Sequence, residues 1–216
     1  MKKLLMFDLD GTLADTLPSI QHAIELAMEH YGFKIPTLEE TEAALGSGAR
    51  QLLKDLVPSD VAKDEAKIDE FLAYYNEMYS KTYMEVEHCY EGMAESVVEL
   101  KKRGYTIAVL SNKQDNYVVD ITAKLIEKGV VSIARGQTEL PTKPNPTVPH
   151  MIMNELGFKP SETVFIGDSD VDIKTAVNAG FESVACSWGF RRRPQLEALN
   201  PDHIIDRPVE ILDIFN

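Results

Sequence analysis

Near its N-terminus the sequence reads Leu4-Leu5-Met6-Phe7-Asp8-Leu9-Asp10-Gly11-Thr12, an apolar run that ends at two aspartates and a glycine. A short apolar run bounded in this way is typical of a strand buried on both faces of a parallel sheet. The two carboxylates that follow need a partner, because an unpaired charge at the edge of a core is costly. Mg²⁺ prefers hard oxygen ligands and is one such partner. Taken alone, the pair also fits a solvated acidic turn.

The remaining sequence divides into a helical stretch and an alternating stretch. From residue 15 to residue 87 apolar residues recur three and four positions apart, which predicts helices and no strand. Beyond Gly92, strand-like runs alternate with helical segments that end at glycines, which predicts parallel βαβ units. We therefore expect an α/β protein with a parallel-sheet core at residues 1–14 and 88–216 and a helical insertion at residues 15–87. The expected core strands are 4–7, 105–110, 130–134, 164–166, 183–187 and 203–205, and the expected core helices are 93–103, 116–128, 146–155 and 172–179.

The composition limits the partners and the compartment. The chain has 216 residues and a formal net charge of −13, which argues against extended contact with nucleic acid or an anionic membrane. The run Arg191–Arg193 is a local exception that we interpret as a solvated turn. No segment has the apolar length of a signal peptide or a membrane span. Cys89 and Cys186 match no metal or redox spacing, so we expect a cytoplasmic protein that acts on a small molecule.

Two further polar segments fall at an expected strand end and an expected helix start. Ser111-Asn112-Lys113 comes directly after the expected second core strand. A hydroxyl and backbone N–H groups there can hold a phosphate oxygen; capping of the next helix is the alternative. Lys143 stands directly before Pro144 and close to Pro146. A rigidly placed ammonium can neutralise charge on a transferring phosphoryl group, whereas an ordinary surface lysine is the simpler interpretation.

A third segment, Gly167–Asp172, follows an apolar run and carries three aspartates. Asp168 at the strand end can reach the same cation as Asp8. Asp172, near a helix N-terminus, can orient Lys143 or a metal-bound water. Helix capping explains one of these carboxylates but not three. Because ligands of open α/β sheets bind at the carboxyl ends of the strands, the polar loops at that edge form our candidate site.

Four segments in this order resemble the motifs of the haloacid dehalogenase superfamily, which consists largely of phosphatases: Asp8–Thr12, Ser111-Asn112, Lys143-Pro144, and Gly167–Ser169 with Asp172. The resemblance covers nearly the whole chain. It implies that the sheet is a Rossmann-like core domain and that the insertion is an all-helical cap domain. Closure of such a cap excludes water from the reaction.

The resemblance also assigns roles to single residues. Asp8 is expected to be the nucleophile and a Mg²⁺ ligand. Asp10 is expected to act as acid and then base, with its backbone carbonyl on the metal. Asp168 and Asp172 are expected to complete the metal site. The residues expected to hold the phosphoryl group or support its site are Gly11, Thr12, Ser111, Asn112 and Lys143.

Within the superfamily the chain is most similar to the phosphoglycolate phosphatase group, through Asp15–Pro18, Ser111–Lys113 and Trp188-Gly189 among other segments. This similarity predicts a Mg²⁺-dependent phosphatase that hydrolyses a small phosphorylated metabolite, with 2-phosphoglycolate as the best guess, through an aspartyl-phosphate intermediate. A substrate carboxylate needs a cation in the insertion. Arg50 is our candidate and Lys54 the alternative.

Other functions remain open at this stage. A phosphomutase similar to β-phosphoglucomutase would share the nucleophile and the acid, and a pyrophosphatase would share the metal chemistry. A dehalogenase is a poorer match, because it is expected to lack a carboxylate at position 10 and to need no Mg²⁺. A non-catalytic phosphate-binding regulator should have lost a motif residue, and this chain has lost none. The sequence is compatible with a monomer or a homodimer.

Overall fold

The computed structural model describes residues 3–216, which fall into two compact units. One unit consists of the chain up to Asp15 together with His88–Asn216, and it contains all the strands that the described residues form. The other unit, Thr16–Glu87, is built from helices. No helix in the described part of the chain is long and apolar enough to cross a membrane.

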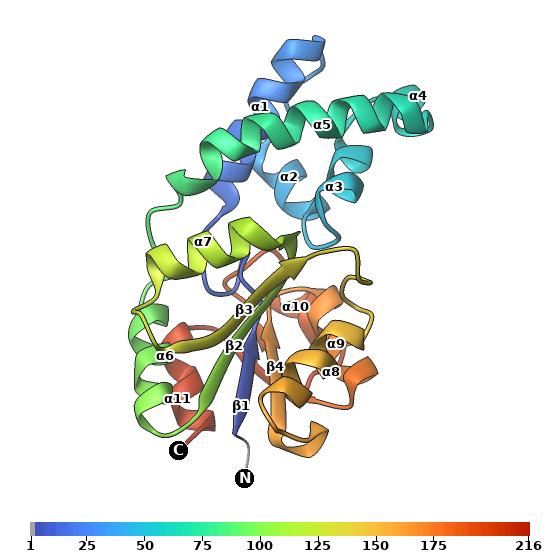
Figure 1. The fold of residues 1–216 in the computed structure, drawn as a ribbon. Coiled ribbons are helices and arrows are strands. Elements are labelled where there is room, and N and C mark those ends of the chain that lie inside the picture. Colours follow the sequence, from blue (N-terminus) through green and yellow to red (C-terminus); the bar gives the residue numbers. More distant parts are fainter. Residues whose placement is uncertain (1–2) are drawn as a thin grey trace. The chain divides into compact units, whose positions relative to one another are not determined.

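Six strands form one parallel sheet in the order β3-β2-β1-β4-β5-β6. β1 lies in its centre, between β2 and β4 (Figure 1). The strand order reverses at β1, and in open α/β sheets ligands bind at such a switch point. The predicted α/β fold class is thereby confirmed. The strands are β1 (Leu4–Phe7), β2 (Thr106–Gln114), β3 (Val131–Gln137), β4 (Thr163–Gly167), β5 (Glu182–Cys186) and β6 (His203–Ile205).

The other regular elements of the described chain are helices. Those of the helical unit are α1 (Leu17–Tyr31), α2 (Leu38–Ala44), α3 (Ala49–Leu56), α4 (Ser59–Ala62), α5 (Glu65–Thr82) and the 3₁₀ turn η1 (Tyr83–Glu85). Those of the sheet unit are α6 (Met93–Lys102), α7 (Asp115–Leu125), α8 (Thr147–Glu155), α9 (Asp170–Ala179), α10 (Arg193–Glu197) and α11 (Ile211–Ile214), with the 3₁₀ turns η2 (Pro160–Glu162) and η3 (Pro208–Glu210).

β1 is central because its side chains are apolar on both faces. All four of its residues are completely buried, and successive side chains of a strand point to opposite faces. Leu4 and Met6 pack with apolar residues of α8 and α9 on one face. α6 and α11 lie on the other side of the sheet (Figure 1). Both faces are therefore covered, as is usual for parallel sheets.

Where elements differ from their predicted bounds, the cause is local. α9 begins at Asp170, two residues early, because Ser169 forms a capping box with Asp172. α7 ends at Leu125, three residues early, where the chain turns to an extended conformation. β2 continues four residues beyond its predicted end to Gln114, past an irregularity in its pairing with β3.

The helical unit has a core of its own, formed mainly between α1 and α5. Ile20 and Ile24 of α1 and Ile68 and Phe71 of α5 are all buried. The spacing of three and four residues places these side chains on one face of each helix. Thr37 caps α2 with a reciprocal capping box that involves Glu40.

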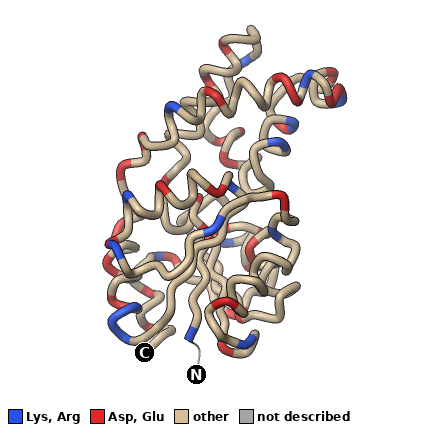
Figure 2. The backbone as a smooth tube through the Cα atoms, in the orientation of Figure 1, with Lys and Arg blue, Asp and Glu red and all other residues tan. Residues whose placement is uncertain are grey.

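Basic residues are interspersed with the more numerous acidic ones along the chain (Figure 2). The run Arg191–Arg193 follows this pattern. Arg193 contacts Glu197 and Asp206, and the Arg191 guanidinium lies 3.8 Å from the Asp170 carboxylate. The run therefore forms ion pairs within the chain.

Candidate active site

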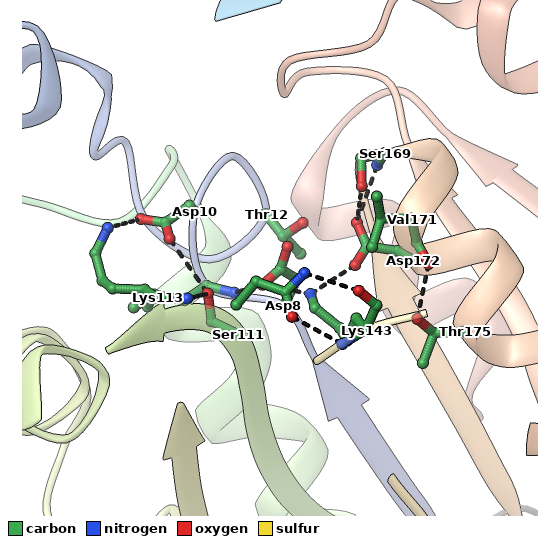
Figure 3. A network of polar contacts seen from close by, with 12 residues as sticks. Asp8, Asp10, Thr12, Ser111, Lys113, Lys143, Ser169, Val171, Asp172 and Thr175 are labelled. Atoms are coloured by element: carbon green, nitrogen blue, oxygen red, sulfur yellow. Dashed lines mark hydrogen bonds and ion pairs between the residues drawn. The ribbon is translucent and has the colours of Figure 1, made fainter. Parts of the chain in front are cut away.

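The polar segments identified in the sequence meet at the carboxyl ends of three neighbouring strands (Figure 3). Asp8 follows β1, Ser111 lies in the last part of β2, and Asp168 follows β4. Lys143 comes from the loop between β3 and α8. These residues are distant in sequence, and the strand order 2-1-4 is what brings them together.

Three carboxylates form the centre of the site. Asp8, Asp168 and Asp172 each offer one oxygen, and these oxygens lie within 4.8 Å of one another. Asp168 and Asp172 are completely buried, and Asp8 is 7% exposed. A group of hard oxygen donors in this setting suits a divalent cation such as Mg²⁺.

Lys143 supplies a positive charge inside this cluster. Its Nζ lies 2.9 Å from Asp8 Oδ1 and 2.7 Å from Asp172 Oδ1. Asn112 holds its backbone from both sides: the Lys143 N–H donates to Asn112 Oδ1 (2.9 Å), and Asn112 Nδ2 donates to the Lys143 carbonyl oxygen (3.0 Å). Lys143 is therefore held at two places: the Asn112 amide holds its backbone, and the Asp8 and Asp172 carboxylates hold its Nζ.

Asp172 is oriented toward Lys143 by the start of α9. Its Oδ2 accepts hydrogen bonds from the backbone N–H (3.0 Å) and the hydroxyl (2.6 Å) of Ser169, and its Oδ1 accepts from Lys143 Nζ. A Cβ at Gly167 would overlap the Asp172 side chain. The carboxylate thus caps the helix and holds the lysine at the same time.

Asp168 is held from two directions. Thr12 Oγ1 donates to its Oδ1 (2.9 Å), and the backbone N–H of Phe190, in the loop after β5, donates to its Oδ2 (2.7 Å). Two glycines allow these segments to approach. A Cβ at Gly11, whose φ is +79°, would meet the Asp168 carboxylate, and a Cβ at Gly189 would overlap the carbonyl oxygen of Gly11.

Asp10 faces a different pair of groups. Its Oδ1 lies 2.7 Å from Lys113 Nζ, and its Oδ2 accepts from Ser111 Oγ at 3.2 Å (Figure 3). Its side chain is 15% exposed. The Asp10 carboxylate thus has other partners than the three clustered carboxylates, and its side chain is partly exposed.

Burial governs the proton affinity of the cluster. Burial first, and then the charge of Asp172, raise the pKa of Asp168 to about 7. Burial also raises the pKa of Asp8 well above its usual range, although the Lys143 ammonium acts to lower it. For Lys143 burial acts to lower the pKa, but Asp172 and Asp8 outweigh it and the pKa rises above its usual value. One ammonium does not balance three carboxylates, so the cluster favours either bound protons or a further cation.

This imbalance predicts a pH dependence of stability. In the absence of divalent cations, we expect the free energy of unfolding to fall as the pH rises from about 4 to about 7. Asp168 has a pKa of about 7 in the folded protein instead of its usual 3.8, so in this window the folded state binds more protons than the unfolded state and their loss favours unfolding. Urea unfolding in EDTA at several pH values measures the slope.

The matched variant for this measurement is Asp168→Asn, which has no proton to lose at this position. We expect it to show a smaller slope in EDTA, and we expect Mg²⁺ to reduce the slope of the unmodified protein. The same slope in the variant and the unmodified protein would assign the pH dependence to other carboxylates.

Arg50, the predicted ligand of a substrate carboxylate, belongs to the helical unit. Its guanidinium donates to Asp69 and Glu65 of α5, and Lys54 also contacts Glu65. Both candidate cations therefore have carboxylate partners inside their own unit. A role of Arg50 or Lys54 in binding substrate stays a prediction.

Two contacts of the site were not predicted from the sequence. Lys113 belongs to the polar segment Ser111–Lys113 that the sequence singles out, but its contact with Asp10 was not predicted. The donor from Phe190 to Asp168 is a backbone N–H, which leaves no side-chain signal. The neighbouring Trp188-Gly189 pair, noted only for the subgroup, was the nearest available indication.

Comparisons with known proteins agree with this geometry. A sequence model of the family described as haloacid dehalogenase-like hydrolase matches residues 5–186. The phosphoglycolate phosphatase of Vibrio parahaemolyticus is 31% identical over 220 residues, which cover 98% of this chain and 95% of that protein. The phosphoglycolate phosphatase of Pseudomonas syringae pathovar syringae is 30% identical over 211 residues, which cover 95% and 77%. The crystal structure of a predicted phosphoglycolate phosphatase from Haemophilus somnus has a TM-score of 0.91 at 27% identity and covers 100% of this chain and 98% of its own.

Proposed function

This chain belongs to the family of haloacid dehalogenase-like hydrolases, and we propose that it is a Mg²⁺-dependent phosphatase that works through an aspartyl-phosphate on Asp8. The observation that carries the proposal is the buried cluster in which Lys143 contacts Asp8 and Asp172 beside Asp168. We propose 2-phosphoglycolate as the preferred substrate, because the relatives that match nearly the whole chain are named phosphoglycolate phosphatase.

The donor set fits Mg²⁺. Three carboxylates with little or no exposure face one ammonium, so the cluster has negative charge to spare for a divalent cation. We assign the carboxylates of Asp8 and Asp168 and the backbone carbonyl of Asp10 to the ion. Asp172 already accepts from Lys143 and Ser169, which favours a role in holding the lysine. Bound Mg²⁺ would neutralise charge on the phosphoryl oxygens.

The first half of the proposed reaction transfers the phosphoryl group to the protein. A carboxylate oxygen of Asp8 attacks phosphorus, the bond from phosphorus to the ester oxygen breaks, and the leaving oxygen takes the proton of the Asp10 carboxylic acid. Lys143 and Ser111 hold the phosphoryl oxygens during this step. Hydrogen bonds hold both residues in place before the reaction. They can therefore stabilise the charge of the transition state without a rearrangement of the site.

The second half releases phosphate. Asp10, now a carboxylate, takes a proton from a water molecule whose oxygen attacks phosphorus, and the bond between phosphorus and the Asp8 oxygen breaks. The products are inorganic phosphate and the free Asp8 carboxylate, with Asp10 again protonated. Exposure of the Asp10 side chain supports this double use, because it can meet first the leaving group and then water.

Two wider assignments accompany this proposal. Thr16–Glu87 is proposed to act as the cap that the family resemblance implies. We also propose a cytoplasmic location, because Cys89 and Cys186 are both free thiols and a reducing compartment keeps thiols in that state.

The test is phosphate release from a panel of compounds with Mg²⁺ and with EDTA. The panel contains 2-phosphoglycolate, simple alkyl phosphates, sugar phosphates and pyrophosphate. We expect turnover only with the metal and the highest kcat/KM for 2-phosphoglycolate. Release from pyrophosphate alone would indicate a pyrophosphatase, and sugar phosphate isomerisation without phosphate release would indicate a mutase. No turnover of any compound by the folded, Mg²⁺-loaded protein would refute the proposal.

A further inference from the structure

In the last part of β2, the side chains of Ser111, Asn112 and Lys113 have different partners. β2 continues to Gln114 past an irregularity in its pairing with β3, and in this segment Ser111 and Lys113 contact one group while Asn112 contacts another. Ser111 and Lys113 both contact the Asp10 carboxylate, whereas Asn112 holds the backbone of Lys143.

Lys113 and Ser111 each hold one oxygen of Asp10. Lys113 Nζ lies 2.7 Å from Oδ1, Ser111 Oγ donates to Oδ2 at 3.2 Å, and the backbone N–H of Lys113 donates to Ser111 Oγ at 3.2 Å. Contacts at both oxygens oppose rotation of the carboxylate about its last bond. Figure 3 shows this group on the opposite side of Asp8 from Asp172.

The burial of this pair separates it from ordinary surface ion pairs. The Lys113 and Asp10 side chains are 8% and 15% exposed, whereas those of Lys81 and Glu77 on α5 are 59% and 61% exposed. Exposed pairs are screened by water and fix geometry poorly, and a mostly buried pair is screened less. The two lysines of the site thus contact different aspartates: Lys143 contacts Asp8 and Asp172, and Lys113 contacts Asp10.

We propose that Lys113 is a positioning residue that holds the Asp10 carboxyl group where it meets the leaving oxygen of the substrate, including when the Ser111 hydroxyl donates to the phosphoryl group instead of Asp10. The inference rests on the proposed function, which gives Asp10 its part in proton transfer. Lys113 itself exchanges no proton and forms no bond to phosphorus. Its effect is to keep Asp10 at the place where the proton is needed when the bond from phosphorus to the ester oxygen breaks.

This role predicts a dependence on the leaving group. An alkyl oxygen leaves only with a proton, so its esters depend on a well-placed Asp10. The 4-nitrophenolate ion is weakly basic and leaves without a proton. Loss of Lys113 should therefore slow the hydrolysis of alkyl phosphates and leave the hydrolysis of 4-nitrophenyl phosphate nearly unchanged. A general disturbance of the site would slow both kinds of ester.

The experiment compares kcat/KM of Lys113→Met with that of the unmodified protein for 2-phosphoglycolate, ethyl phosphate and 4-nitrophenyl phosphate. This ratio reports only the steps up to departure of the leaving group. General acid catalysis contributes about 10²–10⁴-fold, so we expect a loss of about 10²-fold for the two alkyl esters and of less than about threefold for the nitrophenyl ester. Lys113→Arg, which keeps a cation, should recover most of the loss.

Two further variants complete the test. Asp10→Ala should show the same selectivity with a larger loss, and Lys81→Met, which removes an exposed lysine, should leave all three substrates unchanged. Equal losses on the three esters would overturn the positioning role. A loss confined to 2-phosphoglycolate would also overturn it, because Lys113 would then bind the substrate carboxylate. Inactivity of the unmodified protein on every ester would refute the proposed function, whereas activity with an unselective Lys113→Met refutes the Lys113 inference alone.

Discussion

Asp8→Asn is expected to reduce Mg²⁺-dependent phosphate release from 2-phosphoglycolate by about 10⁴-fold or more, because the amide is a poor nucleophile toward phosphorus. The protein should stay folded. Burial raises the pKa of Asp8 well above its usual range, so a neutral amide at this position removes a charge that folding disfavours. Phosphate release and thermal unfolding, both with and without Mg²⁺, measure the two effects.

The control for this variant is Asp213→Asn, which makes the same chemical change at an exposed aspartate in α11. We expect it to keep full activity. If Asp8→Asn retains more than a few per cent of the activity, a water molecule or another residue attacks phosphorus and the aspartyl-phosphate mechanism is wrong.

Lys143→Met is expected to lose both activity and stability. The side chain is 2% exposed and contacts Asp8 and Asp172, so its loss leaves two carboxylates without their cation. Breaking a buried ion pair on one side costs about 3–5 kcal/mol of stability. Loss of the ammonium should also reduce kcat by about 10²–10³-fold, because it stabilises charge on the transferring group. Urea unfolding in EDTA and steady-state kinetics in Mg²⁺ give the two numbers.

Mg²⁺ should restore part of the stability of Lys143→Met, since the cation supplies charge to the same carboxylates. The matched control is Lys174→Met, because Lys174 is 56% exposed and pairs with Asp170 on the surface of α9. Its loss should cost less than about 1 kcal/mol. Equal stabilities of the two variants in EDTA would contradict the central place of Lys143 in the cluster.

The fold was predictable where apolar patterns are unbroken. β1 was predicted to the residue, because Leu4–Phe7 is a fully apolar run that ends at a charge. Ser111–Gln114 was not predicted as part of β2, because these side chains are polar; the first three of them contact residues of the site. The predicted start of α9 at Asp172 is two residues late, because Ser169 caps the helix and the capping carboxylate of Asp172 already lies in its first turn.

The identity of the family was predictable because its motifs consist of side chains. The predicted resemblance is confirmed by the family match and by the names of the relatives, and with it the enzyme class, a phosphoric monoester hydrolase. The contacts that position the motif residues were harder to predict. Asn112 was expected to hold the phosphoryl group or to support its site, and the structure adds which residue its amide holds, the backbone of Lys143. Metal binding by Asp8, Asp10, Asp168 and Asp172 stays a prediction, as does the oligomeric state.

The central position of β1 also determines how late the site can form during synthesis. β1 leaves the ribosome before the other five strands, yet Leu4 pairs with Thr106 on one side and Thr163 on the other. At about 5–20 residues per second, the second neighbour follows roughly 10–30 s later. All residues of the helical unit, Thr16–Glu87, are made before β2 and β4, so the whole unit is present during this delay. β1 therefore remains an apolar strand without one of its two neighbours until β4 has been made, and the Asp168 carboxylate gains its second donor only when the loop that follows β5 supplies the Phe190 N–H.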